Sequence, residues 1–499
     1  MSVSIYDKPR PYDVFTAENI STWERKWIQD TTGFKLMQQA GLMLSETILD
    51  IMYAKGLYQA NILVCCGMGN NGGDGYLVAD HLAKQGYAVT VFAPDTPKTA
   101  DSQAARELSY VLIVDSMPDD EFDVYIDALF GNGLNKDLPP LYQNIIHALN
   151  AKRGLKLAID VPSGLHPDKG KPLPCAFHAD FTLSVMGLRL GFFMGQGRNY
   201  TGQVVYLPLI PIDHHFAALD TRPPRFKRSD IYAHKGTHGH ALIIGGHQQM
   251  GGAVIMAGET AIYSGAGKVT VMCHKSHHQA ILARCPAVMV RDIDDLTDFD
   301  ELLGSVDSVA FGMGLGRDDW ARGRFDKIWQ GLAGFTGFTV LDADALYFIA
   351  EYQVELSDNQ LGTPHIGEAV RLLGEQTDGL FDVQDDNRIS MICDLRFQYG
   401  GNWLLKGANS LVFDRDTVSI KGVEICAFGN ASMATAGMGD VLSGVIAGLK
   451  ARFGSEVSIM DCVSLHALAG DKLGKQGSGR IVASDMPRAV LEMLEELTI

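Results

Sequence analysis

Four residues near the C-terminus, Gly437-Met-Gly-Asp440, place a carboxylate between a glycine turn and an apolar segment, residues 441–449. The glycines allow a tight turn whose backbone N–H groups can face an anion, and a helix beginning near Asp440 adds the positive end of its dipole. An aspartate repels phosphate, so this position favours a base that takes a proton from a hydroxyl attacking a phosphorus held by the loop. The alternative is that Asp440 only caps the helix.

Three polar loops in the N-terminal half carry a second candidate site. They are Gly67-Met-Gly-Asn-Asn-Gly-Gly-Asp-Gly75, Asp127-Ala-Leu-Phe-Gly131 and Asp160-Val-Pro-Ser-Gly164. Each follows an apolar run that reads as a strand, and the carboxyl ends of parallel strands share one sheet edge. Asn71, Asp127 and Ser163 would meet there, and their hard oxygens suit an alkali or alkaline-earth ion better than zinc. The alternative is that these residues only stabilise turns.

The elements that position these loops are read from hydrophobic periodicity. In the first half, strands are expected at residues 60–66, 88–93, 111–114, 123–126 and 155–159, with helices at 16–55 and 74–85. This alternation predicts a parallel sheet between two helical layers, a Rossmann-like three-layer sandwich. Residues 208–235, with four prolines and a basic cluster, are expected to connect it to a second α/β unit. The expected domains are residues 1–220 and 225–499.

Composition limits the function classes. The chain has 499 residues and a net charge of −17, which argues against nucleic acid as a partner. No two of its eight cysteines form a C-x-x-C motif, and all are expected to be buried thiols of a cytoplasmic protein. Neither a signal peptide nor a membrane span is expected.

The N-terminal motifs together resemble the NAD(P)H-hydrate epimerase family (the YjeF N-terminal domain), over about residues 15–215. The resemblance implies K⁺ at Asn71, Asp127 and Ser163, and proton transfer by Asp160 as the epimerase interconverts R and S hydrates. Arg189 stands where the family usually has lysine. If that lysine holds phosphate, arginine replaces it well; if it donates a proton, arginine would impair the epimerase. The implied substrate contacts are Asn70, Asn71, Gly72, Gly73, Asp74, Gly131, Asn132, Gly133, Leu134, Asn135, Lys136, Asp137 and Asp160.

The C-terminal motifs include His234-Lys-Gly-Thr-His-Gly239, Gly312-Met-Gly-Leu-Gly316, Leu341-Asp-Ala-Asp-Ala345 and Thr363-Pro-His-Ile-Gly-Glu368. With Leu405-Lys-Gly-Ala408 and the Asp440 loop, they resemble the NAD(P)H-hydrate dehydratase family over about residues 228–499. The resemblance implies a ribokinase-like three-layer α/β fold. It implies substrate contacts at Ala253, Gly316, His365 and Asp440, and adenine nucleotide contacts at Lys406, Gly407, Ala408, Asn409, Ser410 and Gly439. His365 could instead only cap its helix, and Asp342 and Asp344 could be turn or cap residues.

The combined resemblance implies a fused metabolite-repair enzyme. One domain would epimerise hydrated NADH and NADPH, and the other would dehydrate the S form with ADP and Mg²⁺, giving AMP and phosphate. Asp440 would deprotonate the ring hydroxyl, whose oxygen then attacks the terminal phosphoryl group of ADP. The alternative is a ribokinase-type small-molecule kinase with a non-catalytic nucleotide-binding N-terminal module. The expected partners are these small molecules, with no nucleic acid or membrane, and a homo-oligomer is expected.

Overall fold

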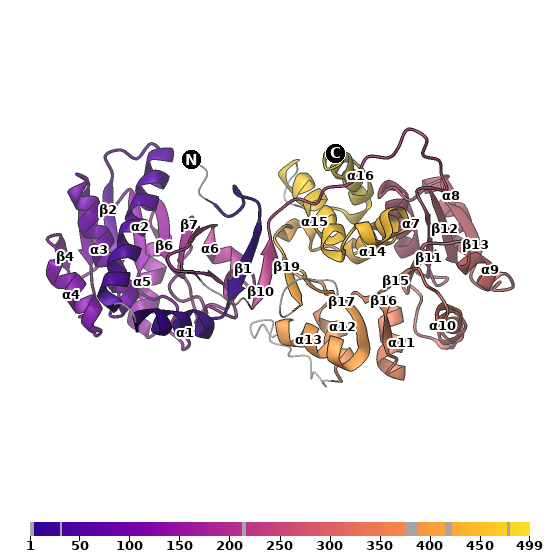
Figure 1. Ribbon diagram of the computed structural model, residues 1–499, viewed down its shortest axis with the longest axis horizontal. Helices are drawn as coiled ribbons and strands as arrows, with labels where there is room; N and C mark the ends of the chain where they lie inside the picture. The colour runs from indigo at the N-terminus through magenta and orange to yellow at the C-terminus, as the bar shows by residue number, and fades with distance from the viewer. Residues whose placement is uncertain (1–3, 30–31, 212–215, 375–387, 415–421, 477–479) are drawn as a thin grey trace. The chain divides into compact units, whose positions relative to one another are not determined.

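The computed structural model describes residues 4–29, 32–211, 216–374, 388–414, 422–476 and 480–499 (Figure 1). Two compact units meet in sequence between Thr221 and Arg222. Part of the expected connection is a strand of the first unit. Strand β10 (Ala217–Asp220) pairs antiparallel with β1 (Pro11–Phe15), and β1 also pairs in parallel with β8 (Leu188–Arg189). The expected connection therefore extends too far toward the N-terminus.

The first unit is built on a seven-stranded sheet in which every pairing is parallel. Counted along the chain, the spatial order of its strands is 3-2-1-4-5-6-7, which confirms the Rossmann-like prediction. The order reverses between β2 and β5, and doubly wound sheets bind ligands at such a point. In spatial order the strands are β4 (Leu112–Val114), β3 (Ala88–Phe92), β2 (Asn61–Cys66), β5 (Val124–Ala128), β6 (Leu155–Ile159), β7 (Phe181–Val185) and β9 (Gln203–Leu207).

Two separate cores lie on the two faces of this sheet, because successive strand side chains point in opposite directions. On β2, Val64 packs into a core that includes residues of α2 (Gly33–Ala54) and α3 (Asn70–Lys84). Leu63 points to the other face, where it joins a core with α5 (Pro140–Ala151). The remaining helices of the unit are α1 (Ala17–Ile28), α4 (Ala100–Leu108) and the short α6 (Arg198–Thr201).

The glycine-rich stretch after β2 differs from the expected loop. Helix α3 begins at Asn70, four residues before the expected start, so the two asparagines and two glycines form its first turn. A Cβ at Gly72 would lie 2.0 Å from Gly67 O, so the backbones approach too closely for any larger residue. Gly72, an implied substrate contact, therefore serves close packing of the backbone.

The second unit is also three-layered. Its sheet is parallel from β13 to β17 and antiparallel from β17 to β19. In spatial order the strands are β13 (Met289–Asp292), β12 (Lys268–Cys273), β11 (His240–Ile244), β14 (Ser308–Phe311), β15 (Phe338–Leu341), β16 (Leu356–Gly362), β17 (Gly400–Leu405), β18 (Leu411–Phe413) and β19 (Val423–Cys426).

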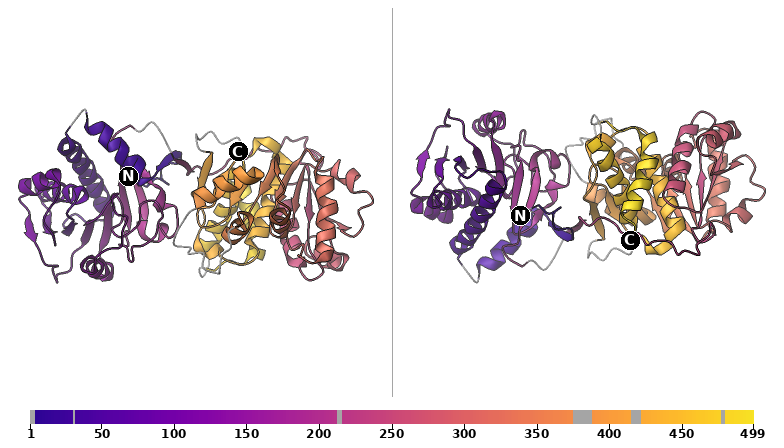
Figure 2. Two further views of the ribbon diagram at one scale, coloured as in Figure 1. Left: turned by 90° about the horizontal axis from the view of Figure 1, so that it is seen from below. Right: turned by 90° about the horizontal axis from the view of Figure 1, so that it is seen from above.

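Helices cover both faces of this sheet within the second unit (Figures 1 and 2). One layer contains α7 (Gly251–Tyr263), α14 (Met438–Phe453), α15 (Ile459–Gln476) and α16 (Met486–Glu496). The other layer contains α10 (Asp319–Leu332), α11 (Asp344–Tyr352), α12 (Ile366–Leu372) and α13 (Arg388–Tyr399). The short helices α8 (His278–Arg284) and α9 (Phe299–Leu303) lie toward the β13 end.

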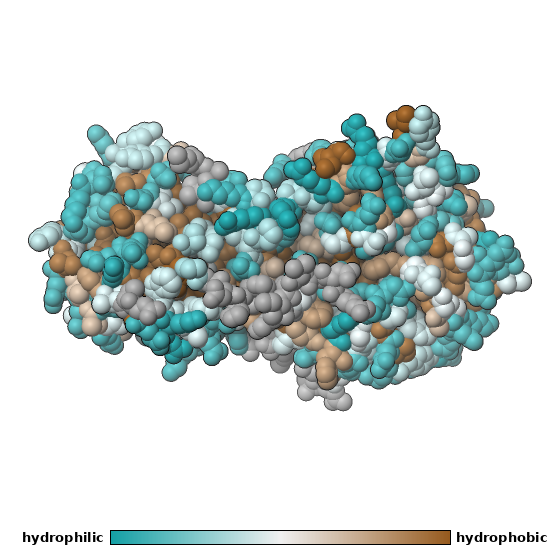
Figure 3. All heavy atoms as spheres, viewed as in Figure 1, coloured by the Kyte–Doolittle hydropathy of each residue, from teal (hydrophilic) through white to brown (hydrophobic). Residues whose placement is uncertain are grey.

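The surface is largely hydrophilic in the view of Figure 3, and most cysteines are buried. Hydrophilic residues are spread over the face in Figure 3, with hydrophobic residues scattered among them. Among the described helices, none is both long and apolar enough to cross a membrane. No disulfide joins cysteines in the described part of the chain. Six of the eight are buried, and Cys175 and Cys393 are partly exposed, so the expectation of buried thiols is wrong for these two.

Helix α14, which carries Asp440, packs directly against α7 through glycine. A Cβ at Gly444 would lie 2.4 Å from Ala257 O, and one at Gly448 would lie 2.5 Å from Ala261 O. These contacts involve the α7 backbone, which cannot move away as a side chain can. The glycines therefore set how closely α14 approaches its neighbour and where its N-terminus lies.

Gly444→Ala should destabilise the protein by about 1–3 kcal/mol, the usual cost of overpacking. We expect a lower midpoint in thermal and denaturant unfolding of the full chain. Gly323→Ala in α10 is the control, because a Cβ there meets nothing within 4 Å. That change should be neutral or stabilise by about 0.5–1 kcal/mol. Equal effects from both changes would contradict the packing argument.

Candidate active sites

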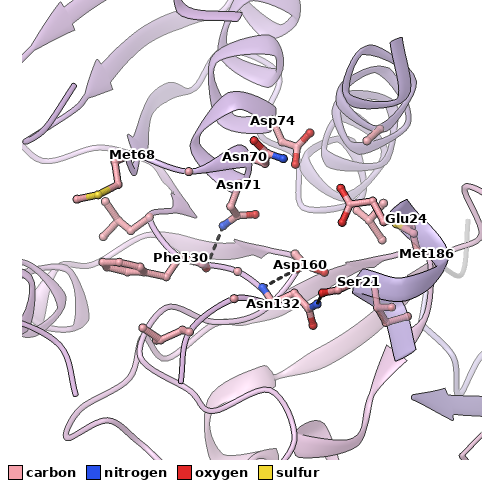
Figure 4. Close-up of a pocket in the computed structure, with 18 of the residues that line it drawn as sticks. Ser21, Glu24, Met68, Asn70, Asn71, Asp74, Phe130, Asn132, Asp160 and Met186 are labelled. Carbon is pink, nitrogen blue, oxygen red and sulfur yellow. Dashed lines mark hydrogen bonds between the residues drawn. The ribbon is translucent and has the colours of Figure 1, made fainter. Parts of the chain in front are cut away.

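A cavity of about 630 Å³ opens at the carboxyl edge of the first sheet, where its strand order reverses. Most of the predicted substrate residues line it. Asn70, Asn71 and Asp74 come from α3, residues 131–137 from the loop after β5, and Asp160 from the end of β6. Gly72 and Gly73 are buried beneath it and do not line it. The three loops therefore converge as predicted (Figure 4).

Of the three predicted metal ligands, Asp127 and Ser163 are buried and Asn71 lines the cavity, and Phe130 bonds to both Asn71 and Ser163. The Ser163 hydroxyl donates to Asp127 Oδ1 at 2.6 Å, and the Ser163 N–H donates to Asp127 Oδ2 at 2.7 Å. Asn71 Nδ2 donates to Phe130 O at 2.9 Å, while Asn71 Oδ1 is buried and receives no hydrogen bond from the described residues. Burial raises the pKa of Asp127 to about 6, although its hydrogen bonds oppose the rise. Asn71 Oδ1 lacks a hydrogen-bond donor in the described part of the chain and the Asp127 carboxyl is buried, so a cation would stabilise both groups.

Asp160 and Arg189 form the main ion pair of the cavity. Arg189 Nη2 lies 2.6 Å from Asp160 Oδ1, and the Arg189 side chain is only 2% exposed. The Asn132 N–H donates to Asp160 Oδ2 at 3.1 Å. Burial raises the pKa of Asp160, and the Arg189 charge and the Asn132 N–H oppose that rise. Asp160 also has φ of +65°, an uncommon backbone conformation often found at functional sites.

Arg189 is held so firmly that it acts as a fixed charge. Its Nε donates to Asn132 Oδ1 at 2.9 Å, and its Nη1 donates to the carbonyls of Val185 and Gly187. A guanidinium does not release its proton near neutral pH. Arg189 therefore orients Asp160 and favours its ionised form, and it does not serve as a proton donor.

Two further carboxyls point into the cavity from helices α1 and α3. These are Glu24 and Asp74 (Figure 4). Burial is the main cause that raises both pKa values, and the charge of Asp160 raises both further. Sequence reasoning missed Glu24, because α1 carries no motif and a single glutamate on an amphipathic helix gives no signal.

The second candidate site lies at the carboxyl edge of the second sheet. Lys406 follows β17 and Asp342 follows β15, and Lys406 Nζ lies 2.6 Å from Asp342 Oδ1. The Asp342 side chain is 3% exposed, and its Oδ2 accepts from the Ser443 hydroxyl at 2.8 Å. Although burial opposes it, the charge of Lys406 lowers the pKa of Asp342. Lys406 is thus held in an ion pair, and Asp342 has a role beyond that of a turn residue.

Asp440 lies in the first turn of α14 beside this pair. The N-cap of α14 is Gly437, so the alternative that Asp440 caps the helix is wrong. Burial and, next, the negative charge of Asp342 raise the pKa of Asp440 to about 7, and the charge of Lys406 opposes the rise. A carboxyl that titrates near 7 is suited to accept a proton at neutral pH. Gly439 faces Lys406, since a Cβ there would lie 3.3 Å from Nζ.

The other predicted contacts surround this edge. Gly316 donates its N–H to Asp344 Oδ2 at 2.9 Å, and Arg317 Nε donates to Asp344 Oδ1 at 2.7 Å. Ala253 lies in the first turn of α7, near the loop that carries Gly316. His365 is the N-cap of α12 and its side chain is 61% exposed, so the capping alternative holds as its structural role.

The predicted nucleotide residues 407–410 form the turn between β17 and β18. Asn409 has φ of +53°, and its side chain donates to Cys426 O at 2.7 Å. Ser410 Oγ donates to Gly407 O at 3.2 Å. The turn follows Lys406 directly, so its backbone and the ammonium group occupy the same end of β17.

Comparison with known proteins finds a matching family for each half of the chain. Residues 33–191 match the family described as YjeF-related protein N-terminus, and residues 241–489 match NAD(P)H-hydrate dehydratase. The bifunctional NAD(P)H-hydrate repair enzyme Nnr of Coxiella burnetii is 35% identical over 473 residues, covering 91% of this chain and 93% of that protein. The chain belongs to the bifunctional NAD(P)H-hydrate repair enzyme family. This confirms the resemblance read from the motifs.

Other members give similar agreement. The Nnr proteins of Vibrio cholerae and Escherichia coli K12 are 34% and 32% identical, covering 97% and 95% of this chain and 99% and 93% of their own lengths. A ribokinase-like superfamily protein from Enterococcus faecalis, 26% identical, superimposes with a TM-score of 0.50 on 55% of this chain and 93% of its own. This confirms the predicted ribokinase-like fold.

Asp440→Asn should stabilise the protein at pH 8, because the folded state no longer has to hold a buried carboxylate. Since the folded pKa of Asp440 is raised from 3.8 to about 7, the wild type loses stability relative to the variant as pH rises through this range. We therefore expect the gap between the two melting temperatures to be largest above pH 7 and to close toward pH 4. Asp319→Asn, an exposed first-turn aspartate of α10, is the control. A gap that grew on acidification would contradict the assignment.

Proposed function

We propose that this chain repairs hydrated NADH and NADPH in two steps. The domain of residues 1–220 interconverts the R and S hydrates. The domain of residues 225–499 dehydrates the S hydrate with ADP, giving the reduced cofactor, AMP and phosphate. The observation that carries the proposal is Asp440, a carboxyl with a pKa of about 7 beside Lys406, in a chain similar to bifunctional repair enzymes along nearly its whole length.

The dehydratase step needs a better leaving group than hydroxide. Asp440 removes the proton of the ring hydroxyl, and the oxygen attacks the terminal phosphorus of ADP, which expels AMP. Lys406 and the N–H groups of the α14 N-terminus stabilise the phosphoryl oxygens. Phosphate then leaves the ring carbon, and loss of a ring proton restores the dihydropyridine. Asp342 holds Lys406 in place, so the ammonium charge stays at the phosphoryl position.

The nucleotide is proposed to bind through Lys406, Gly407, Ala408, Asn409, Ser410 and Gly439. Ala253, Gly316, His365 and Asp440 are proposed to contact the hydrated ring and its phosphates. Mg²⁺ is proposed to enter with the nucleotide, because Mg²⁺ in phosphoryl-transfer sites is held largely by the phosphates with one or two carboxylates. It would neutralise phosphate charge.

The epimerase domain is proposed to hold K⁺ at Asn71, Asp127 and Ser163. Asn71 Oδ1 is a buried carbonyl-type oxygen with no donor among the described residues, and it flanks the loop that also carries Phe130 O. A monovalent ion would satisfy this oxygen and offset the charge of Asp127. The substrate is proposed to contact Asn70 to Asp74, Gly131 to Asp137 and Asp160 above the ion.

We place the chain in the cytoplasm, because eight cysteines without a disulfide suit a reducing compartment. We also expect it to self-associate as a homo-oligomer.

The decisive assay mixes purified protein with R and S hydrated NADH, ADP and Mg²⁺, and follows the return of reduced-nicotinamide absorbance. Full recovery, faster than the spontaneous exchange without protein, is expected. Recovery of only the S fraction would overturn the epimerase half and implicate Arg189. A stable phosphorylated product in place of released phosphate would favour a small-molecule kinase.

Asp440→Asn should abolish dehydration of the S hydrate while nucleotide binding persists. General-base catalysis contributes about 10²–10⁴-fold, so turnover should fall at least 100-fold, with the affinity for ADP within a few-fold of wild type. Steady-state turnover and calorimetric titration with ADP measure the two quantities. Asp319→Asn again serves as the control. Near-normal turnover of Asp440→Asn would refute the proposed base.

KCl should raise the melting temperature of the full chain more than NaCl does at equal ionic strength. An ion that binds only the folded state stabilises it by about 2.7 kcal/mol at 100 times its dissociation constant. Asn71→Ala should remove the difference between the two salts. Asn70→Ala is the matched control, because the side chain of Asn70 bonds to Thr99 and lies outside the proposed ligand set. Equal effects of the two salts on the wild type would contradict the K⁺ site.

A further inference from the structure

Inversion at the hydroxyl-bearing carbon by loss and re-addition of water requires two proton transfers on opposite faces of the ring. One C–O bond must break as the hydroxyl leaves, and another must form as water adds to the other face. The departing hydroxyl needs an acid, and the incoming water needs a base. This reasoning rests on the proposed epimerase function. Asp160 can serve only one of these roles at a time, so a second group is needed.

Helix α1 presents one face to the cavity, and hydrogen bonds fix that face. Asn132 Nδ2 donates to Ala17 O at 3.0 Å and to the Ser21 hydroxyl at 3.1 Å. Residues three or four apart share a helix face, so Glu24 follows Ser21 on the side of the cavity. The close-up shows the Glu24 carboxyl pointing inward from α1, with Asp160 across the cavity at the sheet edge (Figure 4).

Glu24 and Asp160 differ in what surrounds their carboxyls. Asp160 has the Arg189 guanidinium at 2.6 Å and the Asn132 N–H at 3.1 Å. Among the described residues, none donates a hydrogen bond to the Glu24 carboxyl. The charged groups that face it are Asp160, Arg189 and, on α4, Asp101. Asp74 on α3 also interacts with Glu24.

This asymmetry separates the protonation states of the pair. Arg189 and the Asn132 N–H favour the Asp160 carboxylate, although burial raises its pKa. Burial and the nearby Asp160 carboxylate both raise the pKa of Glu24, and no donor among the described residues opposes this at its carboxyl, so the surroundings of Glu24 favour the protonated form. Two carboxyls whose surroundings favour opposite protonation states form an acid–base pair, as in inverting glycoside hydrolases.

We propose that Glu24 is the second catalytic carboxyl of the epimerase, acting as the acid opposite Asp160. Glu24 gives its proton to the ring hydroxyl, and the C–O bond breaks as the ring nitrogen lone pair forms a C=N⁺ bond. The hydroxyl leaves as water. A second water adds to the other face of the planar cation, and Asp160 takes its proton as the C=N⁺ electrons return to nitrogen. One water leaves and one enters, and the proton lost by Glu24 equals the proton gained by Asp160. Exchange with solvent returns the proton from Asp160 to Glu24 before the next R hydrate reacts.

Asp74 is the competing candidate for this acid. Its carboxyl also points into the cavity from α3, and burial raises its pKa well above the ordinary value. Glu24 lies on α1, and Asn132 links α1 to the ion pair, because its side chain donates to Ala17 O and its N–H donates to Asp160 Oδ2. Asp74 lies on α3, where the described residues show no such link.

The test uses the full chain with purified R hydrate and no ADP, and separates the epimers by chromatography. Glu24→Gln should lower the epimerase kcat at least 100-fold, the lower bound for general acid catalysis, with KM changed only a few-fold. The wild-type profile should fall at high pH as Glu24 ionises, and the variant should lose this alkaline limb. Glu18→Gln, on the exposed side of α1, is the matched control and should match the wild type.

A second variant separates chemistry from structure. Glu24→Ala should regain activity with added formate buffer, in proportion to the undissociated acid, which a purely structural glutamate would not show. Unchanged kcat in Glu24→Gln would overturn the proposal, as would absence of rescue. If Asp74→Asn alone removes the alkaline limb, the acid is Asp74 and the assignment to Glu24 is wrong. If the wild type itself does not epimerise the R hydrate, the proposed epimerase function fails instead.

Discussion

The ion pair between Lys406 and Asp342 organises the second site. A carboxylate that is 3% exposed is tolerated only with a cation or strong donors, and Asp342 has Lys406 on one oxygen and Ser443 on the other. Ser443 lies on α14, one turn beyond Asp440, so the same carboxylate ties the end of β17 to the helix that carries the proposed base. Removing Asp342 would take away the shorter of two ion pairs of Lys406 and the acceptor of the Ser443 hydroxyl at once.

The first site repeats this arrangement with different residues. Asp160 is held by Arg189 and by the backbone of the loop after β5, and Arg189 is held in turn by Asn132 and two carbonyls. In each unit, one cation pairs with one carboxylate, while a neighbouring carboxyl that forms no ion pair within hydrogen-bond distance of any described residue has a raised pKa: Glu24 in the first and Asp440 in the second. The fixed charge provides geometry, and the unpaired carboxyl provides a proton site that can titrate.

Much of this was predictable from the sequence, for identifiable reasons. The Rossmann-like sheet follows from buried apolar runs separated by helices, and the convergence of Asn71, Asp127 and Asp160 follows from parallel strands ending at one edge. The partners of those residues were not predictable. Nothing at Asp342 indicates a bond to Lys406, 64 residues away, since that contact depends on the order β15-β16-β17. Glu24 lies on a helix outside the sheet, whose docking depends on Asn132. The start of α3 was misplaced because its first turn contains two glycines, which are poor helix formers.

The raised pKa of Asp440 also explains why such a site is costly to keep. Ionising this carboxyl in the folded protein is unfavourable, so at neutral pH the residue lowers the stability of the fold that holds it. A salt-bridged aspartate would be more stable, but it would bind a proton too weakly to take one from a ring hydroxyl. The close packing of α14 on α7 through Gly444 offers compensation, because a rigid helix cannot relax to expose the carboxyl to water. Burial of Asp440 thus gives the residue both its proton affinity and its cost in stability, and the contact of Gly444 with α7 keeps the residue buried.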